Sequence, residues 1–242
     1  MDQGTSIDKT ADDIAEAIFY HKVKAAHDKL FGAQGGPYNI DSVAYFAAAI
    51  ESYQYARDQM RKAARFDSRE GLLDFSLDKI SLDGLVLEFG VFSGHTINII
   101  ADKLNRQMIH GFDSFKGLPE DWTAGAKAGA FARDGLPAVR GNVDLVVGWF
   151  DDTLRTFLAS HPGNISFLHV DCDLYSSTRT ILTEARDRIV PGTVILFDEY
   201  FNYPDWKRHE HRAFQEFVYE NSIKYEYIGL VPAFEQVAAR IL

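Results

Sequence analysis

The spacing of apolar positions along the chain changes near residue 80. Before it, residues 12–30 and 42–64 carry apolar side chains at helical spacing, and Gly71–Leu77 suits a short third helix. After it, short apolar runs alternate with helical stretches. We therefore expect a helical extension at residues 1–78, serving as a lid or a dimer face, and a core at residues 79–242.

Short apolar runs in the core predict a sheet of seven strands. The predicted strands are Leu85–Phe89, Met108–Phe112, Val143–Val147, Ile165–Val170, Thr193–Phe197, Tyr225–Leu230 and Gln236–Leu242. Helical patterns at 96–104, 152–160, 177–190 and 212–219 separate most of them. This alternation predicts an α/β fold with a doubly wound, Rossmann-like sheet. Because only a short connection joins the last two runs, the last strand should be antiparallel.

Amino-acid composition and net charge limit the classes of binding partner that we expect for this chain. The chain has 242 residues, 46% of them hydrophobic, and a net charge of -10. An acidic chain repels nucleic acid and anionic membranes, so we expect neither as a partner. The single cysteine, Cys172, excludes a disulfide within one chain. The sequence shows neither a signal-peptide pattern nor an apolar run near the ~20 residues of a membrane span, which predicts a cytoplasmic protein.

A glycine turn follows the first core strand, in residues 88–94 (EFGVFSG). The dinucleotide fingerprint G-x-G-x-x-G fails because positions 92 and 95 are Phe and His, which disfavours a nicotinamide oxidoreductase. Glu88 before the turn suits a cationic ligand, and Asp113 at the end of the next strand can accept ribose hydroxyls. Together they predict S-adenosylmethionine (SAM) as the cofactor.

Four carboxylates follow two further strands. Asp171 and Asp173 come after one strand, and Asp198 and Glu199 after the next. Because these strand ends should converge, the four side chains predict an oxygen-rich pocket suited to Mg2+. The alternation of side chains places Asp171 and Asp173 on one side and Cys172 on the other, where packing is the simplest role.

Five motifs together resemble the macrocin O-methyltransferase family, which includes metal-dependent sugar O-methyltransferases of antibiotic biosynthesis. They are VLEFGVFSG (86–94), GFDSFKGLP (111–119), GWFDDTL (148–154), HVDCDLY (169–175) and FDEY (197–200). The resemblance covers roughly residues 84–232, in the family's order.

The resemblance implies roles for these residues. It implies cofactor binding by Glu88, Gly90, Phe92, Ser93, Gly94, Thr96, Asp113, Ser114, Gly148, Trp149 and Asp171. It further implies Asp171, Asp198 and Glu199 as metal ligands and Asp173 as general base. Where the family usually has Asp-Asp-Tyr, this chain has Asp198-Glu199-Tyr200. The longer side chain at position 199 puts the identity of the metal in question.

The predicted function is therefore SAM-dependent, Mg2+-dependent O-methylation of a small-molecule hydroxyl. The expected acceptor is a sugar or a glycosylated natural product, and the expected assembly is a homodimer or higher homo-oligomer. Two alternatives stay open: a phenol or catechol acceptor, and a SAM-binding protein without catalysis. His209 or His211 could compete with Asp173 as the base. The long connection at residues 115–140 is expected to be a lid.

Overall fold

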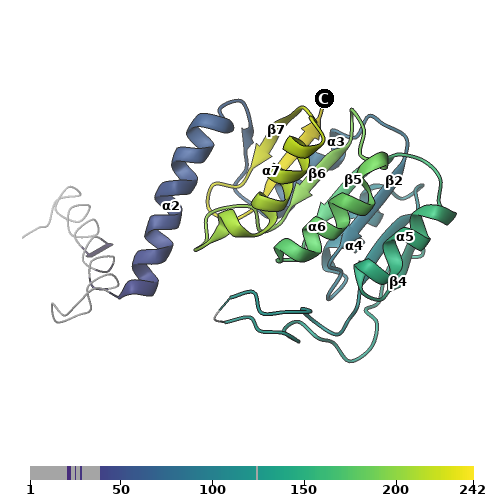
Figure 1. The fold of residues 1–242 in the computed structure, drawn as a ribbon, viewed down its shortest axis with the longest axis horizontal. Helices are drawn as coiled ribbons and strands as arrows, with labels where there is room; N and C mark the ends of the chain where they lie inside the picture. The colour runs from purple at the N-terminus through teal and green to yellow at the C-terminus, as the bar shows by residue number, and fades with distance from the viewer. Residues whose placement is uncertain (1–20, 23–24, 26–27, 29–38, 124) are drawn as a thin grey trace, which may run out of the picture.

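A computed structural model describes residues 21–22, 25, 28, 39–123 and 125–242 (Figure 1). The predicted helix at residues 12–30 lies outside the described residues, apart from four helical positions. The helices are α2 Ile40–Gln59, α3 Arg69–Asp78, α4 His95–Lys103, α5 Phe150–Ser160, α6 Tyr175–Glu184 and α7 Glu210–Glu220, with 3-10 turns η1 Arg186–Arg188 and η2 Trp206–Arg208. None of the described helices is long and apolar enough to cross a membrane.

Within the described residues, one sheet of eight strands has the order β1-β7-β8-β6-β5-β2-β3-β4. The strands are β1 Ala64–Arg65, β2 Leu85–Phe89, β3 Ile109–Asp113, β4 Val143–Val147, β5 Ile165–Val170, β6 Val194–Phe197, β7 Tyr225–Leu230 and β8 Val237–Ile241. Strand β8 is antiparallel to both neighbours, and the remaining pairs are parallel. The predicted Rossmann-like α/β fold with an antiparallel last strand is confirmed.

The eighth strand, β1, corrects the sequence prediction. Residues 42–64 were predicted as one helix, but α2 ends at Gln59 and Ala64 pairs with Gly229 at the edge of the sheet. Helical spacing of apolar residues reflects local burial, and it cannot show that a two-residue segment will pair with a strand more than 160 positions away.

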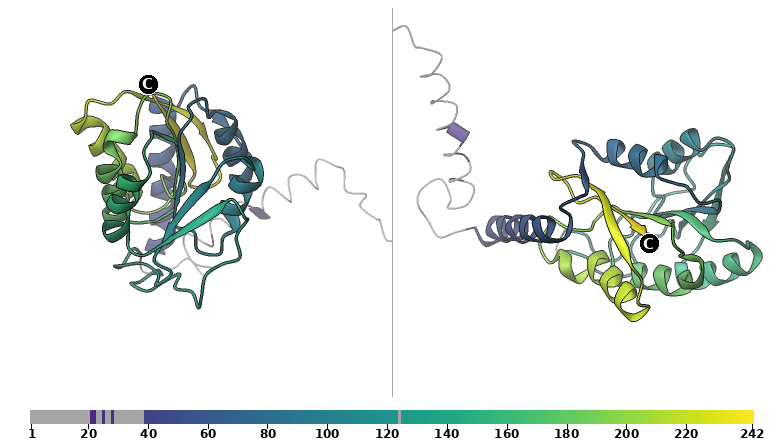
Figure 2. Two further views of the ribbon diagram at one scale, coloured as in Figure 1. Left: turned by 90° about the vertical axis from the view of Figure 1, so that its right-hand side faces the viewer. Right: turned by 90° about the horizontal axis from the view of Figure 1, so that it is seen from above.

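Two layers of helices cover the sheet, as Figure 2 shows from above. Helices α5, α6 and α7 pack along one face, and α3 and α4 pack along the other. Side chains alternate along each strand. Leu87 and Phe89 therefore lie in the core under α5, α6 and α7, and Val86 lies in the core under α3 and α4. The central strands are apolar on both faces because both faces are buried.

Helix α2 buries three small side chains, those of Ala48, Ser52 and Ala56. Tyr55 of this helix joins the core through its hydroxyl, which lies 2.6 Å from that of Tyr227. Its larger apolar side chains, by contrast, are exposed: Ile40, Val43, Tyr45, Phe46, Ile50 and Tyr53. Helix α2 therefore presents an apolar surface that the described chain leaves uncovered.

Candidate functional site

A cavity of about 720 Å³ opens at the carboxyl ends of the parallel strands. Its walls come from the ends of β2, β3, β5 and β6, from the first turns of α5 and α6, and from the connection after β3. Doubly wound sheets bind ligands in this position because their strand ends diverge there. The predicted site residues should therefore meet here if the sequence interpretation is correct.

Gly90 forms the turn that leaves β2 towards the cavity. Its φ is +94°, and a Cβ at this position would lie 1.6 Å from the carbonyl oxygen of Asp171. Only glycine avoids this clash and adopts this backbone conformation without strain. The requirement for Gly90 therefore comes from the close approach of the β2 and β5 ends.

Asp113 organises the loop beside this turn. Its Oδ2 accepts the backbone N–H groups of Val91 and Phe92 at 3.0 and 2.8 Å, and its Oδ1 accepts that of Phe115 at 2.7 Å. The carboxylate thus holds the loops after β2 and β3 together at the wall of the cavity. A carboxylate offers about four acceptor positions, so Asp113 keeps capacity for a further donor such as a ribose hydroxyl.

Glu88 is fully buried and pairs with a histidine. Nδ1 of His169 lies 3.4 Å from Oε2 of Glu88, and neither side chain is more than 2% exposed. Burial alone would lower the pKa of His169, but the carboxylates of Glu88, Asp171 and Asp198 raise it to about 9. Glu88 therefore acts inside the sheet, since it does not line the cavity where we expected it to meet SAM.

The four predicted carboxylates do line the cavity together. Burial, with Asp198 as the next contribution, raises the pKa of Asp173 to about 7 and that of Asp171 well above its usual range. Burial and the same neighbour raise the pKa of Glu199. Such shifts indicate negative charge that the site does not fully compensate.

Arg69, at the start of α3, supplies part of the compensation. Its guanidinium lies 3.3 Å from Oδ2 of Asp198 and 3.6 Å from Oε2 of Glu235. Half of this side chain is exposed, so water screens its charge. One half-exposed guanidinium does not balance the four carboxylates, so a further cation would stabilise them.

The residues present fit a divalent metal ion. Ligand atoms of His169, Asp171 and Asp198 all lie within 4.8 Å of one another. Oε2 of Glu199 is buried and has no hydrogen-bond partner among the described residues. Carboxylate oxygens suit hard cations such as Mg2+ and Mn2+, and an added imidazole suits Zn2+ better than Mg2+. Glu199, which the sequence places in the ligand set, is not one of the three closely grouped residues.

Most of the predicted site residues come together. Those at the cavity wall are Gly90, Phe92, Asp113, Ser114, Trp149, Asp171, Asp173, Asp198 and Glu199. Glu88, Ser93, Gly94, Thr96 and Gly148 do not line it. Thr96 instead borders a smaller cavity of about 150 Å³, which it shares with His169, Asp171 and Asp198. Gly94 caps α4 with a φ of +78°.

The alternation expected after β5 does not continue to Asp173. Strand β5 ends at Val170, and Asp173 has a φ of +64°, so the chain turns away from the sheet. Cys172 packs its sulfur 3.4 Å from the hydroxyl of Thr178, as a packing role predicts, yet it also borders the cavity. Burial raises the pKa of the Cys172 thiol, which opposes a nucleophilic role.

The two candidate histidines lie outside the cavity wall. His209 packs edge-on to Trp122, with ring centroids 6.4 Å apart. His211 packs among Tyr55, Tyr200 and Trp206, with centroids 4.7–5.1 Å from its own. Their positions favour Asp173 over either histidine as the base.

Sequence reasoning missed Arg69, His169 and Trp122. Arg69 reaches the cavity from a segment far from the motifs, so local patterns carry no signal for it. Trp122 lies three positions after the motif at 111–119, in a connection whose path the sequence does not show. His169 could have been found, because it lies near the end of β5, two positions before Asp171, and alternation along an extended chain places the two side chains on the same side.

Comparison with known proteins agrees with this geometry. A family model described as a methyltransferase domain matches residues 87–200. A curated relative from Streptomyces olivaceus, 8-demethyl-8-(2,3-dimethoxy-alpha-L-rhamnosyl)-tetracenomycin-C 4'-O-methyltransferase, is 27% identical over 160 residues, or 53% of this chain. The matched region spans 58% of that relative's length.

Two solved structures share the fold. The calicheamicin methyltransferase CalS11 has a TM-score of 0.58 at 20% identity, and the match covers 99% of each chain. The O-methyltransferase NovP has a TM-score of 0.55 at 22% identity, over 71% of this chain and 78% of its own. The name of the curated relative describes an O-methyltransferase of a rhamnosyl compound, which confirms the resemblance to sugar O-methyltransferases that the sequence motifs indicated.

Proposed function

We propose that this protein is a SAM-dependent O-methyltransferase that acts on a hydroxyl of a small molecule, with a sugar or a glycosylated natural product as the acceptor. The observation that carries the proposal is one cavity that joins two sets of residues: the Gly90 turn with Asp113, and the acidic group around Asp173. The first set suits a ribose and a sulfonium cation. The second suits a hydroxyl that must lose a proton.

Asp173 is the residue we assign as general base. It is 8% exposed, it lines the cavity, and its positive φ turns it away from the sheet. A base must reach the acceptor hydroxyl while SAM lies on the other side, so that oxygen, methyl carbon and sulfur can align. In the reaction the acceptor oxygen bonds to the methyl carbon, the carbon–sulfur bond breaks, and Asp173 takes the hydroxyl proton.

Asp171 and Asp198 are the residues we assign to a divalent metal, with Glu199 as the third ligand that the sequence predicts. A ring nitrogen of His169 lies within 4.8 Å of ligand atoms of Asp171 and Asp198. It would bind the metal only after losing its proton, since the neighbouring carboxylates raise its pKa to about 9. A bound divalent cation would supply Lewis acidity that lowers the pKa of the acceptor hydroxyl. Whether the ion is Mg2+ depends on which third ligand binds, because Mg2+ prefers oxygen.

Replacement of Asp173 by Asn tests the assignment. We expect Asp173→Asn to lose at least about 100-fold in methyl transfer to a sugar acceptor, since general bases contribute about 10²–10⁴-fold. S-adenosylhomocysteine should still bind the variant. Asp152→Asn, an exposed change in the first turn of α5, is the control.

The metal is tested in the same assay. Dialysis against EDTA should abolish turnover, and Mg2+ or Mn2+ should restore it. Full activity of Asp173→Asn would refute the base, and an undiminished rate in chelator would refute the metal.

A further inference from the structure

Glu210 is a buried carboxylate that the proposed reaction does not use. It is the first residue of α7, and 0% of its surface is exposed. It does not line the cavity, unlike Asp171, Asp173, Asp198 and Glu199. A buried acid at such a position needs hydrogen-bond donors to compensate for lost hydration.

Two backbone amides provide those donors. Oε1 of Glu210 accepts the N–H of Cys172 at 3.5 Å, and Oε2 accepts the N–H of Glu199 at 3.2 Å. Cys172 stands between Asp171 and Asp173, and Glu199 follows Asp198 directly. One side chain thus contacts the backbone of both acidic loops.

These contacts begin where the sheet ends. The last ladder-type bonds at this edge run from the N–H of Asp171 to Phe89 and from the N–H of Asp198 to Val170, both at 2.9 Å. The next backbone N–H along each loop, that of Cys172 or Glu199, donates to the side chain of Glu210. Beyond β5 and β6, the carboxylate therefore takes over the role that strand pairing plays inside the sheet.

We propose that Glu210 is a positioning residue that fixes the separation of the two acidic loops, and hence the spacing of Asp171 and Asp173 relative to Asp198 and Glu199. The inference rests on the proposed function for its consequence, since that spacing would decide how well the site holds a metal. Residues that orient metal ligands typically change metal affinity about 10–100-fold when replaced.

Amide hydrogen exchange tests the bridge without any assumption about activity. Glutamine at position 210 keeps one acceptor oxygen and turns the other into a donor, so it can receive only one of the two amides. Glu210→Gln should speed exchange at Cys172 or Glu199 about 10-fold or more, and Glu210→Ala should do so at both. The amide of Ile195, inside β6, should not change.

Glu220→Gln is the matched control, because Glu220 is an exposed residue at the other end of α7 that pairs with Arg179. It should leave all of these amides unchanged. If Cys172 and Glu199 keep wild-type protection in Glu210→Gln, the bridge does not exist and the proposal is overturned. Should Glu210→Ala fail to fold, Glu210→Gln still decides.

Mn2+ binding, followed by electron paramagnetic resonance, tests the consequence. We expect Glu210→Gln to weaken Mn2+ binding about 10-fold or more, with S-adenosylhomocysteine affinity within about twofold of wild type. Unchanged Mn2+ affinity would overturn the positioning role. If wild type binds no Mn2+, the metal assigned under the proposed function is wrong. Hydrogen exchange at Cys172 and Glu199 then decides whether Glu210 holds the two loops together.

Discussion

His211 shows how one buried side chain can tie stability to pH. Neither ring nitrogen has a hydrogen-bond partner among the described residues. Burial, with a smaller contribution from Lys207, lowers its pKa to about 4. An unfolded histidine titrates near 6.5, so the unfolded chain binds this proton more readily than the folded one. The stability that the neutral ring contributes is therefore complete above pH 6.5 and declines as the pH falls towards 4.

We predict that His211 lowers the unfolding free energy of wild type by about 1–2 kcal/mol when the pH falls from 7.5 to 5. His211→Phe should lose that share of the pH dependence, and the difference between the two proteins removes the effect of other groups. Urea unfolding at both pH values measures it. Equal pH dependence in both proteins would contradict the assigned pKa.

At the same scale, the sequence identified residues more reliably than it identified their roles. Gly90, Asp113 and the four acids could be found because they follow apolar runs that end at one edge of the sheet. The burial of Glu88 could not be predicted, since it depends on His169 in the neighbouring strand. Glu210 was missed because its partners are backbone amides, and these leave no mark in a sequence.

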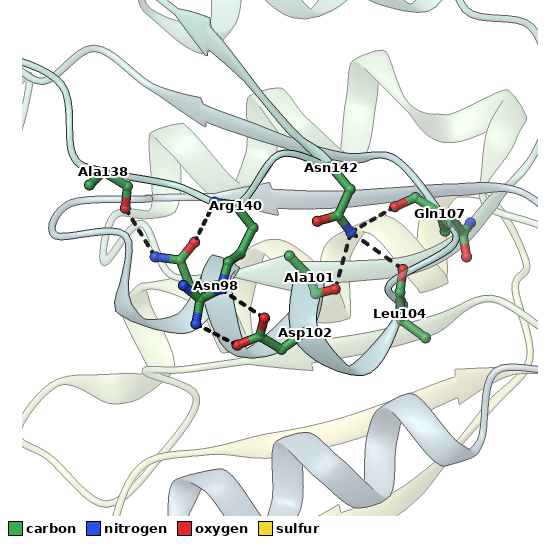
Figure 3. A network of polar contacts seen from close by, with 8 residues as sticks. All are labelled: Asn98, Ala101, Asp102, Leu104, Gln107, Ala138, Arg140 and Asn142. Atoms are coloured by element: carbon green, nitrogen blue, oxygen red, sulfur yellow. Dashed lines mark hydrogen bonds and ion pairs between the residues drawn. The ribbon is translucent and has the colours of Figure 1, made fainter.

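Among the elements, the connection between β3 and β4 is held at its far end by α4 (Figure 3). The side chain of Asn98 donates to the carbonyl of Ala138 at 3.0 Å and accepts the N–H of Arg140 at 2.9 Å. Arg140 pairs with Asp102 at 2.7 and 2.8 Å. The expected lid is therefore fastened where it meets β4, and any opening would occur nearer its middle.

Asn142 completes this attachment. Its Nδ2 donates to the carbonyls of Ala101 and Gln107 at 3.1 and 3.0 Å, at the end of α4 where carbonyls lack helical partners. We predict that Asn142→Ala lowers the unfolding free energy by about 1–3 kcal/mol. Asn105→Ala, an exposed change in the turn after α4, should cost under about 0.5 kcal/mol. Thermal unfolding of the two variants measures the contrast, and equal losses would count against this role.

Strands were predicted more accurately than the α2–β1 region, for a physical reason. Apolar runs such as Ile165–Val170 are buried on both faces of the sheet, and that burial is visible in their composition. The end of α2 and the pairing of Ala64 depend on a distant strand. Helical spacing in α2 also does not show which of its aromatic residues are buried, and Tyr45, Phe46 and Tyr53 are exposed.

For the whole molecule, this exposed surface bears on the predicted homo-oligomer. Tyr45, Phe46, Ile50 and Tyr53 are 45–65% exposed on one helix. Aromatic side chains grouped this way are typical of protein interfaces. We predict a dimer by light scattering, with about twice the 27.3 kDa of one chain. Phe46→Ser with Ile50→Ser should give a monomer, and a wild-type monomer at micromolar concentration would contradict the prediction.

The division of the chain at residue 78 also stays a prediction at this scale. Helix α3 packs against α4 and against strands β6, β7 and β8, and Arg69 reaches the acidic group from its first turn. The helical extension therefore lines part of the cavity through Arg69, and it also carries the exposed apolar residues of α2.

The proposed function requires the cavity to bind SAM beside Asp173 and the neighbouring carboxylates. Calorimetric titration with S-adenosylhomocysteine tests it most directly, in wild type, Asp113→Asn and Asp173→Asn. We predict binding to wild type, binding within about threefold to Asp173→Asn, and a loss of about 10-fold or more in Asp113→Asn, which removes a charged acceptor. Absence of binding to wild type, or equal binding to Asp113→Asn, would contradict the account.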